Sequence, residues 1–255
     1  MRVVVTRPES EARRWLEDLR ARGIDALLLS LIDIAPVPQP AALHAAWRRL
    51  AQRQSVMFVS GNAVREFFAQ RPDGVAWPAA TRAWATGNGT RDALLRAAVP
   101  ASLVDAPPES SAQFDSETLW QQVGGQVAEG AAVLIVRGGD ADGAAVGRDW
   151  LATQLHDAGA RVETVVAYVR RAPVWSEAQR QKARDAAGTG SAWLFSSSQA
   201  VAHLQGLLPG QDWSQARAVA THPRIASAAR DCGFGVVCES RPTVDAVVAA
   251  LESFR

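Results

Sequence analysis

Polar residues that can bind an anion recur where an apolar run of the chain gives way to a helical pattern. A helix N-terminus presents unpaired backbone N–H groups and a partial positive charge, and arginine adds a planar fork of donors that suits carboxylates. Serine, threonine and asparagine are also common helix caps, so ordinary capping remains the alternative for each turn. The candidate binding residues at these turns are Arg7, Ser60, Asn62, Gly87, Thr90, Arg137, Gly138, Arg148, Ser196, Ser197, Thr221 and Arg224.

Two further side chains can move a proton. Tyr168 is the only tyrosine of the chain and stands two residues before Arg170, within an apolar segment. Its phenol can donate a proton or a hydrogen bond inside a cleft; the alternative is an aromatic ring packed in a linker. His222 can also donate a proton, but a single histidine in a loop is more often a polar surface residue.

The sequence argues against sites for a dinucleotide, zinc, calcium or a nucleotide phosphate. Asp92 stands where a dinucleotide fingerprint needs its third glycine, and Cys232 and Cys238 lack the spacing of zinc ligands. The segment 137–143 lacks the distal glutamate of a calcium loop and the lysine of a phosphate-binding P-loop. We therefore expect neither a metal nor a cofactor.

The composition of the chain limits the kinds of molecule that it can bind. The formal net charge is +1, which argues against nonspecific binding of nucleic acid. No apolar run approaches the roughly 20 residues of a membrane span, and the N-terminus reads as a strand rather than a signal peptide. With only two cysteines, a reducing cytoplasm fits best. We expect a cytoplasmic protein with no membrane contact.

Strand and helix patterns alternate along the whole chain, which predicts an α/β fold with parallel sheets and crossover helices. The expected strands cover residues 2–6, 26–34, 56–59, 82–85, 102–104, 133–136, 162–169, 192–195, 217–220 and 235–238. The expected helices cover 10–22, 41–52, a stretch from 62, 89–98, 116–127, 146–158, 176–187, 199–207, 224–231 and 243–253.

The chain also contains an internal repeat. Three segments recur in the same order, with offsets of 191 − 55 = 136, 217 − 82 = 135 and 159 − 23 = 136. They pair residues 55–64 with 191–201, 82–90 with 217–225, and 16–36 with 151–173. This duplication predicts two similar Rossmann- or flavodoxin-like domains. Ligands of open parallel sheets bind beyond the carboxyl ends of the strands, so we expect two such edges to face one cleft.

The order of the motifs resembles the uroporphyrinogen-III synthase family. The resemblance is carried by VTRP, VSGNAV, the GNGT of Gly87–Thr90, the VRG at 136–138, AYVR around Tyr168, the serines at 196–198, PRIA at 223–226 and the terminal PTVDAVVAAL. The chain departs from the family pattern in a longer loop at 138–146 and in His222, where the family often has serine.

The resemblance implies a discontinuous domain and an extended linker of two strands. One domain would consist of residues 1–35 with 173–255, and the other of residues 38–168. The linkers would lie near 31–39 and 165–172.

The resemblance also implies an activity that needs no cofactor. The substrate would be hydroxymethylbilane, which loses its terminal hydroxyl as water, inverts its last pyrrole ring through a spiro intermediate and closes to uroporphyrinogen III. Tyr168 would assist departure of the hydroxyl. Arg7, Arg137, Arg148 and Arg224, with backbone N–H groups at Ser60, Gly87 and Ser197, would hold carboxylates. The partners expected are this substrate alone, with the protein a monomer in transient contact with the preceding pathway enzyme.

Two other functions remain open at this point. A two-lobed protein that binds an acidic ligand without catalysis shares the same architecture. A dinucleotide-dependent oxidoreductase or methyltransferase would need a glycine fingerprint followed by an acidic residue for the ribose.

Overall fold

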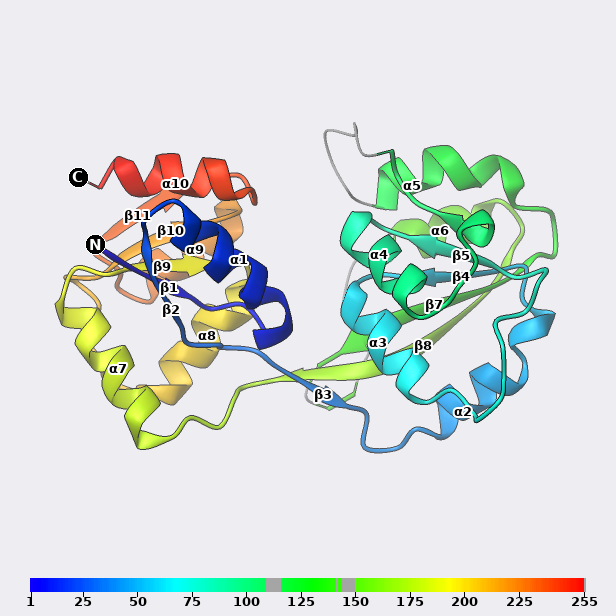
Figure 1. The fold of residues 1–255 in the computed structure, drawn as a ribbon, viewed down its shortest axis with the longest axis horizontal. Helices are drawn as coiled ribbons and strands as arrows, with labels where there is room; N and C mark the ends of the chain where they lie inside the picture. Colours follow the sequence, from blue (N-terminus) through cyan, green and yellow to red (C-terminus); the bar gives the residue numbers. More distant parts are fainter. Residues whose placement is uncertain (109–115, 141, 144–149, 255) are drawn as a thin grey trace. The chain divides into compact units, whose positions relative to one another are not determined.

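A computed structural model describes residues 1–108, 116–140, 142–143 and 150–254. Its internal contacts divide the chain into two compact units. Unit 1 comprises Met1–Asp33 and Arg171–Arg255, and unit 2 comprises Ile34–Arg170 (Figure 1). Each unit is a sheet of mainly parallel strands covered by helices, which confirms the predicted α/β class. Within the described residues, no helix has the length and apolar character needed to cross a membrane.

Unit 1 contains a five-stranded sheet in the order β11-β10-β9-β1-β2, with every neighbouring pair parallel. Its strands are β1 (Arg2–Val5), β2 (Asp25–Leu28), β9 (Ala192–Phe195), β10 (Arg217–Ala220) and β11 (Val236–Glu239). Its helices are α1 (Glu9–Ala21), α7 (Glu177–Gly188), α8 (Ser198–Leu207), α9 (Pro223–Asp231) and α10 (Val244–Glu252).

The three central strands of this sheet, β1, β9 and β10, are buried on both faces, which is why they are apolar without alternation. On one face, Val5 and Leu194 pack in a cluster with side chains of α1 and α10. These two helices lie side by side in Figure 1. On the other face, Trp193 makes an edge-on contact with Trp213, with ring centroids 5.2 Å apart. Successive side chains of β9 therefore supply two separate cores.

Unit 2 contains a six-stranded sheet in the order β3-β8-β7-β4-β5-β6. Its strands are β3 (Asp33–Pro36), β4 (Ser55–Phe58), β5 (Arg82–Ala85), β6 (Val104–Asp105), β7 (Ala132–Gly139) and β8 (Arg161–Arg171). Its α-helices are α2 (Ala41–Arg48), α3 (Gly61–Ala69), α4 (Asn88–Arg96), α5 (Ser116–Val123) and α6 (Trp150–Asp157). Single 3-10 turns occupy η1 (Leu50–Gln52), η2 (Ala101–Leu103) and η3 (Gly124–Gln126).

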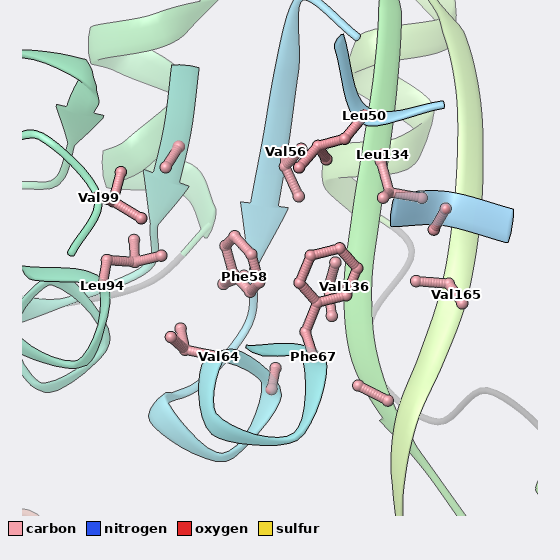
Figure 2. Packing of buried hydrophobic residues seen from close by; sticks show 14 of the residues in the cluster. Leu50, Val56, Phe58, Val64, Phe67, Leu94, Val99, Leu134, Val136 and Val165 are labelled. Carbon is pink, nitrogen blue, oxygen red and sulfur yellow. The ribbon is translucent and has the colours of Figure 1, made fainter. Parts of the chain in front are cut away.

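The larger core of unit 2 lies between the sheet and helices α2, α3 and α4. Figure 2 shows Phe58 of β4 and Phe67 of α3 within it, beside Val136 of β7. Trp47 of α2 stacks on Phe67 with ring centroids 4.7 Å apart and donates its indole N–H to the carbonyl of Phe67 at 2.9 Å. On the opposite face, Trp84 packs with residues of α5 and α6.

Two predicted strands are wrong. The one expected at 102–104 is mostly the 3-10 turn η2, and β6 begins only at Val104. The apolar run at 26–34 forms two strands, because β2 ends at Leu28 and β3 begins at Asp33. Between them, the carbonyl of Ser30 accepts the indole N–H of Trp175 at 3.0 Å, and the carbonyl of Leu31 bonds with Nδ1 of His203 at 2.6 Å. Side chains distant in sequence thus provide the hydrogen bonds of these carbonyl groups. The strand-to-strand hydrogen bonds are therefore interrupted here, although the hydropathy of the segment predicts one continuous strand.

Two predicted helices end earlier than expected. The α-helical part of the segment 41–52 stops at Arg48 and continues as η1, and that of 116–127 stops at Val123 and continues as η3. The second stop coincides with Gly124-Gly125, a pair of poor helix formers. The start of the helix predicted at 146–158 lies outside the described residues, which resume with α6 at Trp150.

The Phe67 ring is completely buried, whereas its neighbour Phe68 is only partly buried against the same cluster. We expect Phe67→Ala to lower the free energy of unfolding by about 3–5 kcal/mol, because the ring leaves a cavity that the sheet cannot fill. Phe68→Ala, the matched control on the same helix, should cost less than half as much. Chemical denaturation followed by circular dichroism measures both, and equal losses would contradict this assignment of the core.

Candidate active site

The parallel sheet of unit 2 brings several predicted site residues to one edge. Strands β4, β5 and β7 run in the same direction, so the residues that follow them lie at the same end of the sheet. Ser60 caps the N-terminus of α3, and Gly87 stands at the N-cap of α4. Ligands of open α/β sheets bind at such an edge.

Tyr168 lies on β8 with its phenol bonded to two side chains. Its OH is 3.2 Å from Oγ of Ser60, and it accepts an N–H of Arg170 at 3.1 Å. The Arg170 guanidinium also lies over the ring, with Cζ 5.7 Å from the centroid, within the range of a cation–π contact. Tyr168 itself is completely buried, whereas Ser60 and Arg170 are partly exposed.

Gly138 of β7 lies directly against the Tyr168 ring. A Cβ built on this glycine would stand 2.6 Å from Cζ of Tyr168 and 2.8 Å from its OH. The register explains the approach: Arg137 pairs with Val166, but Gly138 pairs with Tyr168, so β8 carries one extra residue, Ala167. Such a bulge re-aims the side chain that follows it. We call Ser60, Gly138, Tyr168 and Arg170 the Tyr168 cluster.

Other predicted residues of unit 2 point mainly into the protein. Asn62, Thr90 and Arg137 are buried, with 3%, 6% and 6% of their surface exposed. Oδ1 of Asn62 accepts an N–H of Arg65. The carbonyl of Gly87 accepts the backbone N–H of Thr90 at 3.0 Å, which opens α4. Arg148 lies outside the described residues.

At the corresponding edge of unit 1, Arg7 follows β1 and is mostly enclosed, with 16% of its side chain exposed. Its Cζ lies 4.7 Å from the ring centroid of Trp15, and Nη1 is 3.7 Å from a carboxylate oxygen of Glu11. Burial lowers the pKa of Arg7, and the Glu11 carboxylate acts in the opposite direction. The guanidinium still carries its charge at neutral pH, so it remains a candidate for binding a carboxylate.

The remaining predicted residues of unit 1 lie at helix starts. Oγ of Ser197 caps α8 by accepting the N–H of Gln199 at 3.2 Å, directly after the half-buried Ser196. Thr221 follows β10 and is half-buried. His222 caps α9: its Nδ1 accepts the backbone N–H of Arg224 at 3.1 Å, which takes the role of the serine often found there. The Arg224 side chain belongs to an exposed residue.

Arg170 is the residue of the Tyr168 cluster that sequence reasoning did not assign to the site. A usable signal was present, because residues two apart on a strand lie on the same face. Arg170 therefore shares the face of Tyr168 on β8. Among the described residues, no group of three or more histidine, cysteine, aspartate or glutamate side chains could hold a metal ion.

Two parallel α/β units, with polar helix N-termini at the carboxyl ends of their strands, define a two-domain α/β protein of the kind that binds small molecules. Residues 13–249 match the family described as uroporphyrinogen-III synthase HemD, so the chain belongs to that family, whose members are cyclising lyases. No curated protein matches the chain.

Solved structures share the fold. Uroporphyrinogen-III synthetase from Helicobacter pylori has a TM-score of 0.62 at 14% identity, with 100% of both chains covered. A mutant uroporphyrinogen III synthase from the extremely thermophilic bacterium Thermus thermophilus has a TM-score of 0.54 at 17% identity, covering 100% of this chain and 98% of that one. At these identities the similarity establishes the fold, while the family match establishes the family.

The contact between Gly138 and the Tyr168 ring predicts that a side chain at position 138 destabilises the protein only while the ring is present. Gly138→Ala should lower the free energy of unfolding by about 1–3 kcal/mol, because its methyl group overlaps a buried ring. In a Tyr168→Ala background the same substitution should cost little. Gly206→Ala is the control: it lies on α8 with nothing within 4 Å of its Cβ, and should be neutral or stabilising. An equal cost of Gly138→Ala in both backgrounds would show that the ring is not the obstacle.

Proposed function

We propose that the Tyr168 cluster is the reaction centre at which this uroporphyrinogen-III synthase closes hydroxymethylbilane. The observation that carries the proposal is a buried phenol, bonded to a half-exposed serine and to an arginine at the carboxyl edge of a parallel sheet. This edge is where α/β proteins place their ligands. The family match supplies the reaction, and the cluster supplies a proton donor for it.

The reaction needs only weak acid catalysis, but it needs precise positioning of the substrate. The pyrrole rings are electron-rich, so the terminal hydroxyl departs once its oxygen is protonated or strongly hydrogen-bonded. Closure without the enzyme gives the wrong isomer. The protein therefore has to hold the linear chain in the conformation that leads to inversion of the last ring, which is catalysis by orientation.

Tyr168 assists the departure of the hydroxyl as a donor of a proton or a hydrogen bond. Its ring is fixed by the core of unit 2 and by Gly138, so the phenol oxygen occupies one position. A donor that is already oriented costs no reorganisation when charge develops. Arg170, on the same strand face, provides the positive charge next to that oxygen.

Arginines and helix N-termini hold the carboxylates of the substrate in this proposal. Arg7, Arg137, Arg148 and Arg224 offer charged donors, and the backbone N–H groups at Ser60, Gly87 and Ser197 offer neutral ones. The remaining residues assigned to substrate binding, Asn62, Thr90, Gly138, Ser196 and Thr221, complete the two sheet edges. The partial enclosure of Arg7 supports its role, because a half-desolvated guanidinium binds a carboxylate more strongly than a fully hydrated one.

We further propose that the protein works as a cytoplasmic monomer that receives its substrate from the preceding pathway enzyme. Its two cysteines, Cys232 and Cys238, are both free thiols, which suits a reducing compartment. Burial raises the pKa of Cys232 to about 11, so this thiol stays protonated and unreactive near neutral pH.

The decisive experiment compares the wild-type chain with Tyr168→Phe, using hydroxymethylbilane and separating the porphyrin isomers after oxidation. The wild type should form the type III isomer faster than the uncatalysed reaction forms type I. The variant should lose on the order of 100-fold in kcat, the lower end of what general acid catalysis contributes, with an unchanged circular dichroism spectrum. Wild-type turnover in the variant would remove Tyr168 from the mechanism, and type I product alone from the wild type would remove the function.

Arg7 gives a separate test of carboxylate binding. Arg7→Gln should raise KM about tenfold with little change in kcat, because a charge-assisted hydrogen bond contributes roughly 1.5–3 kcal/mol to binding of both substrate and transition state. Arg14→Gln, on the helix α1 that begins just after Arg7 but with 88% of its side chain exposed, is the matched control and should leave KM unchanged. Steady-state kinetics distinguishes the two, and an unchanged KM for Arg7→Gln would exclude it from the binding site.

A further inference from the structure

We infer that Ser60 is the group that meets the departing hydroxyl, at the end of a one-way hydrogen-bond chain that runs from Arg170 through Tyr168. This inference rests on the proposed function and refines it: Tyr168 supplies the proton, Ser60 delivers it, and Arg170 sets the direction. The three side chains come from α3 and β8 of one compact unit.

The first link has a fixed direction. A guanidinium has N–H donors and no acceptor, so the 3.1 Å contact between Arg170 and the Tyr168 oxygen is a donation by Arg170. The phenol's own hydrogen must therefore go elsewhere. Tyr168 is completely buried, and the other hydrogen-bond partner of its OH within the described residues is Oγ of Ser60, at 3.2 Å.

Burial decides the direction of the second link. If Ser60 donated to Tyr168, the phenol hydrogen would be enclosed without an acceptor, and an unsatisfied buried donor is strongly disfavoured. Donation by Tyr168 to Ser60 satisfies both groups. The pair therefore has one preferred orientation, in which the serine oxygen is the acceptor.

Ser60 is left with a free donor. Its oxygen has two lone pairs, and they are taken by the Tyr168 phenol and by the backbone N–H of Ala63, whose nitrogen lies 3.2 Å away. The serine hydrogen has no place in either bond. Since Ser60 is partly exposed and Tyr168 is not, the serine is the member of this pair that a ligand can reach, and it reaches that ligand as a donor.

The proposed step balances without any further reactant. The Ser60 proton passes to the terminal hydroxyl oxygen, the C–O bond breaks with its electron pair on the departing water, and the Tyr168 proton moves to the serine oxygen. The phenolate then lies beside the Arg170 cation, and the substrate is a cation delocalised over its pyrrole. The last pyrrole closes the ring through its substituted α-carbon, which gives the spiro intermediate. The older bond from that carbon to the neighbouring methylene then breaks and forms again at the free α-carbon of the same ring. That carbon loses its proton, which returns through Ser60 to Tyr168.

Arg170 is a positioning residue in this scheme, since it acts through the phenol. Arg170→Met should lower kcat with KM little changed, and Arg170→Lys, which keeps a charged N–H donor, should restore part of the loss. In a Tyr168→Phe background there is no phenol oxygen to orient, so Arg170→Met should have no additional effect on kcat. If the role of Arg170 were purely structural, Arg170→Met would lower kcat by the same factor in both backgrounds.

Ser60 is tested by the same kind of cycle. Ser60→Ala should reduce kcat for type III formation on the order of 100-fold, as Tyr168→Phe does, and the double variant should be no slower than either single variant. Ser60→Thr keeps the hydroxyl and should retain most of the activity. Ser176→Ala is the matched control: Ser176 caps α7 of unit 1 by accepting the N–H of Gln179 at 3.3 Å, whereas the cluster belongs to unit 2, and its loss should leave kcat unchanged.

The outcomes separate this inference from the function on which it rests. Wild-type kcat in Ser60→Ala beside a slow Tyr168→Phe would show that the phenol contacts the substrate itself, which overturns the chain but keeps the reaction centre. Losses that multiply in the double variant would also overturn it, since the two residues would then act independently. Wild-type kcat in all the single variants would reject both the chain and the reaction centre.

Discussion

Strand β8 carries one residue more than its partner β7, and the position of Tyr168 depends on this irregularity. Strict alternation would place Tyr168 on the face opposite to Val165 and Ala167. Because the register shifts at Gly138, all three side chains join the same buried cluster. The bulge thus delivers a polar ring into an apolar core, and the phenol can remain there only because Ser60 and Arg170 satisfy it.

The alternation of strands and helices is predictable because it rests on local patterns. The strands at 82–85, 192–195 and 217–220 coincide with β5, β9 and β10 residue for residue. Where a predicted strand boundary is wrong, as at 26–34, the cause is a contact with residues distant in the sequence. Nothing near Ser30 in the sequence indicates that Trp175 will occupy its carbonyl and so interrupt the apolar run. The end of a strand is decided by partners that hydropathy does not identify.

The residues of the candidate site also fall into those that local sequence patterns predict and those that depend on distant contacts. That Ser60 would cap a helix and lie at a sheet edge follows from the strand-turn-helix pattern. That Tyr168 would contact Ser60, 108 residues earlier in the chain, depends on the strand order and on the extra residue in β8. A bulge has no clear signature in a run such as VVAYVRR, because every register leaves apolar residues on both faces. Arg170 could have been noticed from its spacing alone, but its contact with the phenol could not.

The exclusion of a side chain at Gly138 has a consequence for related chains. As long as position 168 holds an aromatic ring in this orientation, natural variation at position 138 is closed to every amino acid larger than glycine. A lineage that exchanged the ring for a small side chain would release that restriction at once. The two positions should therefore drift together over evolutionary time, and a homologue with alanine or serine at 138 should carry an altered residue at 168.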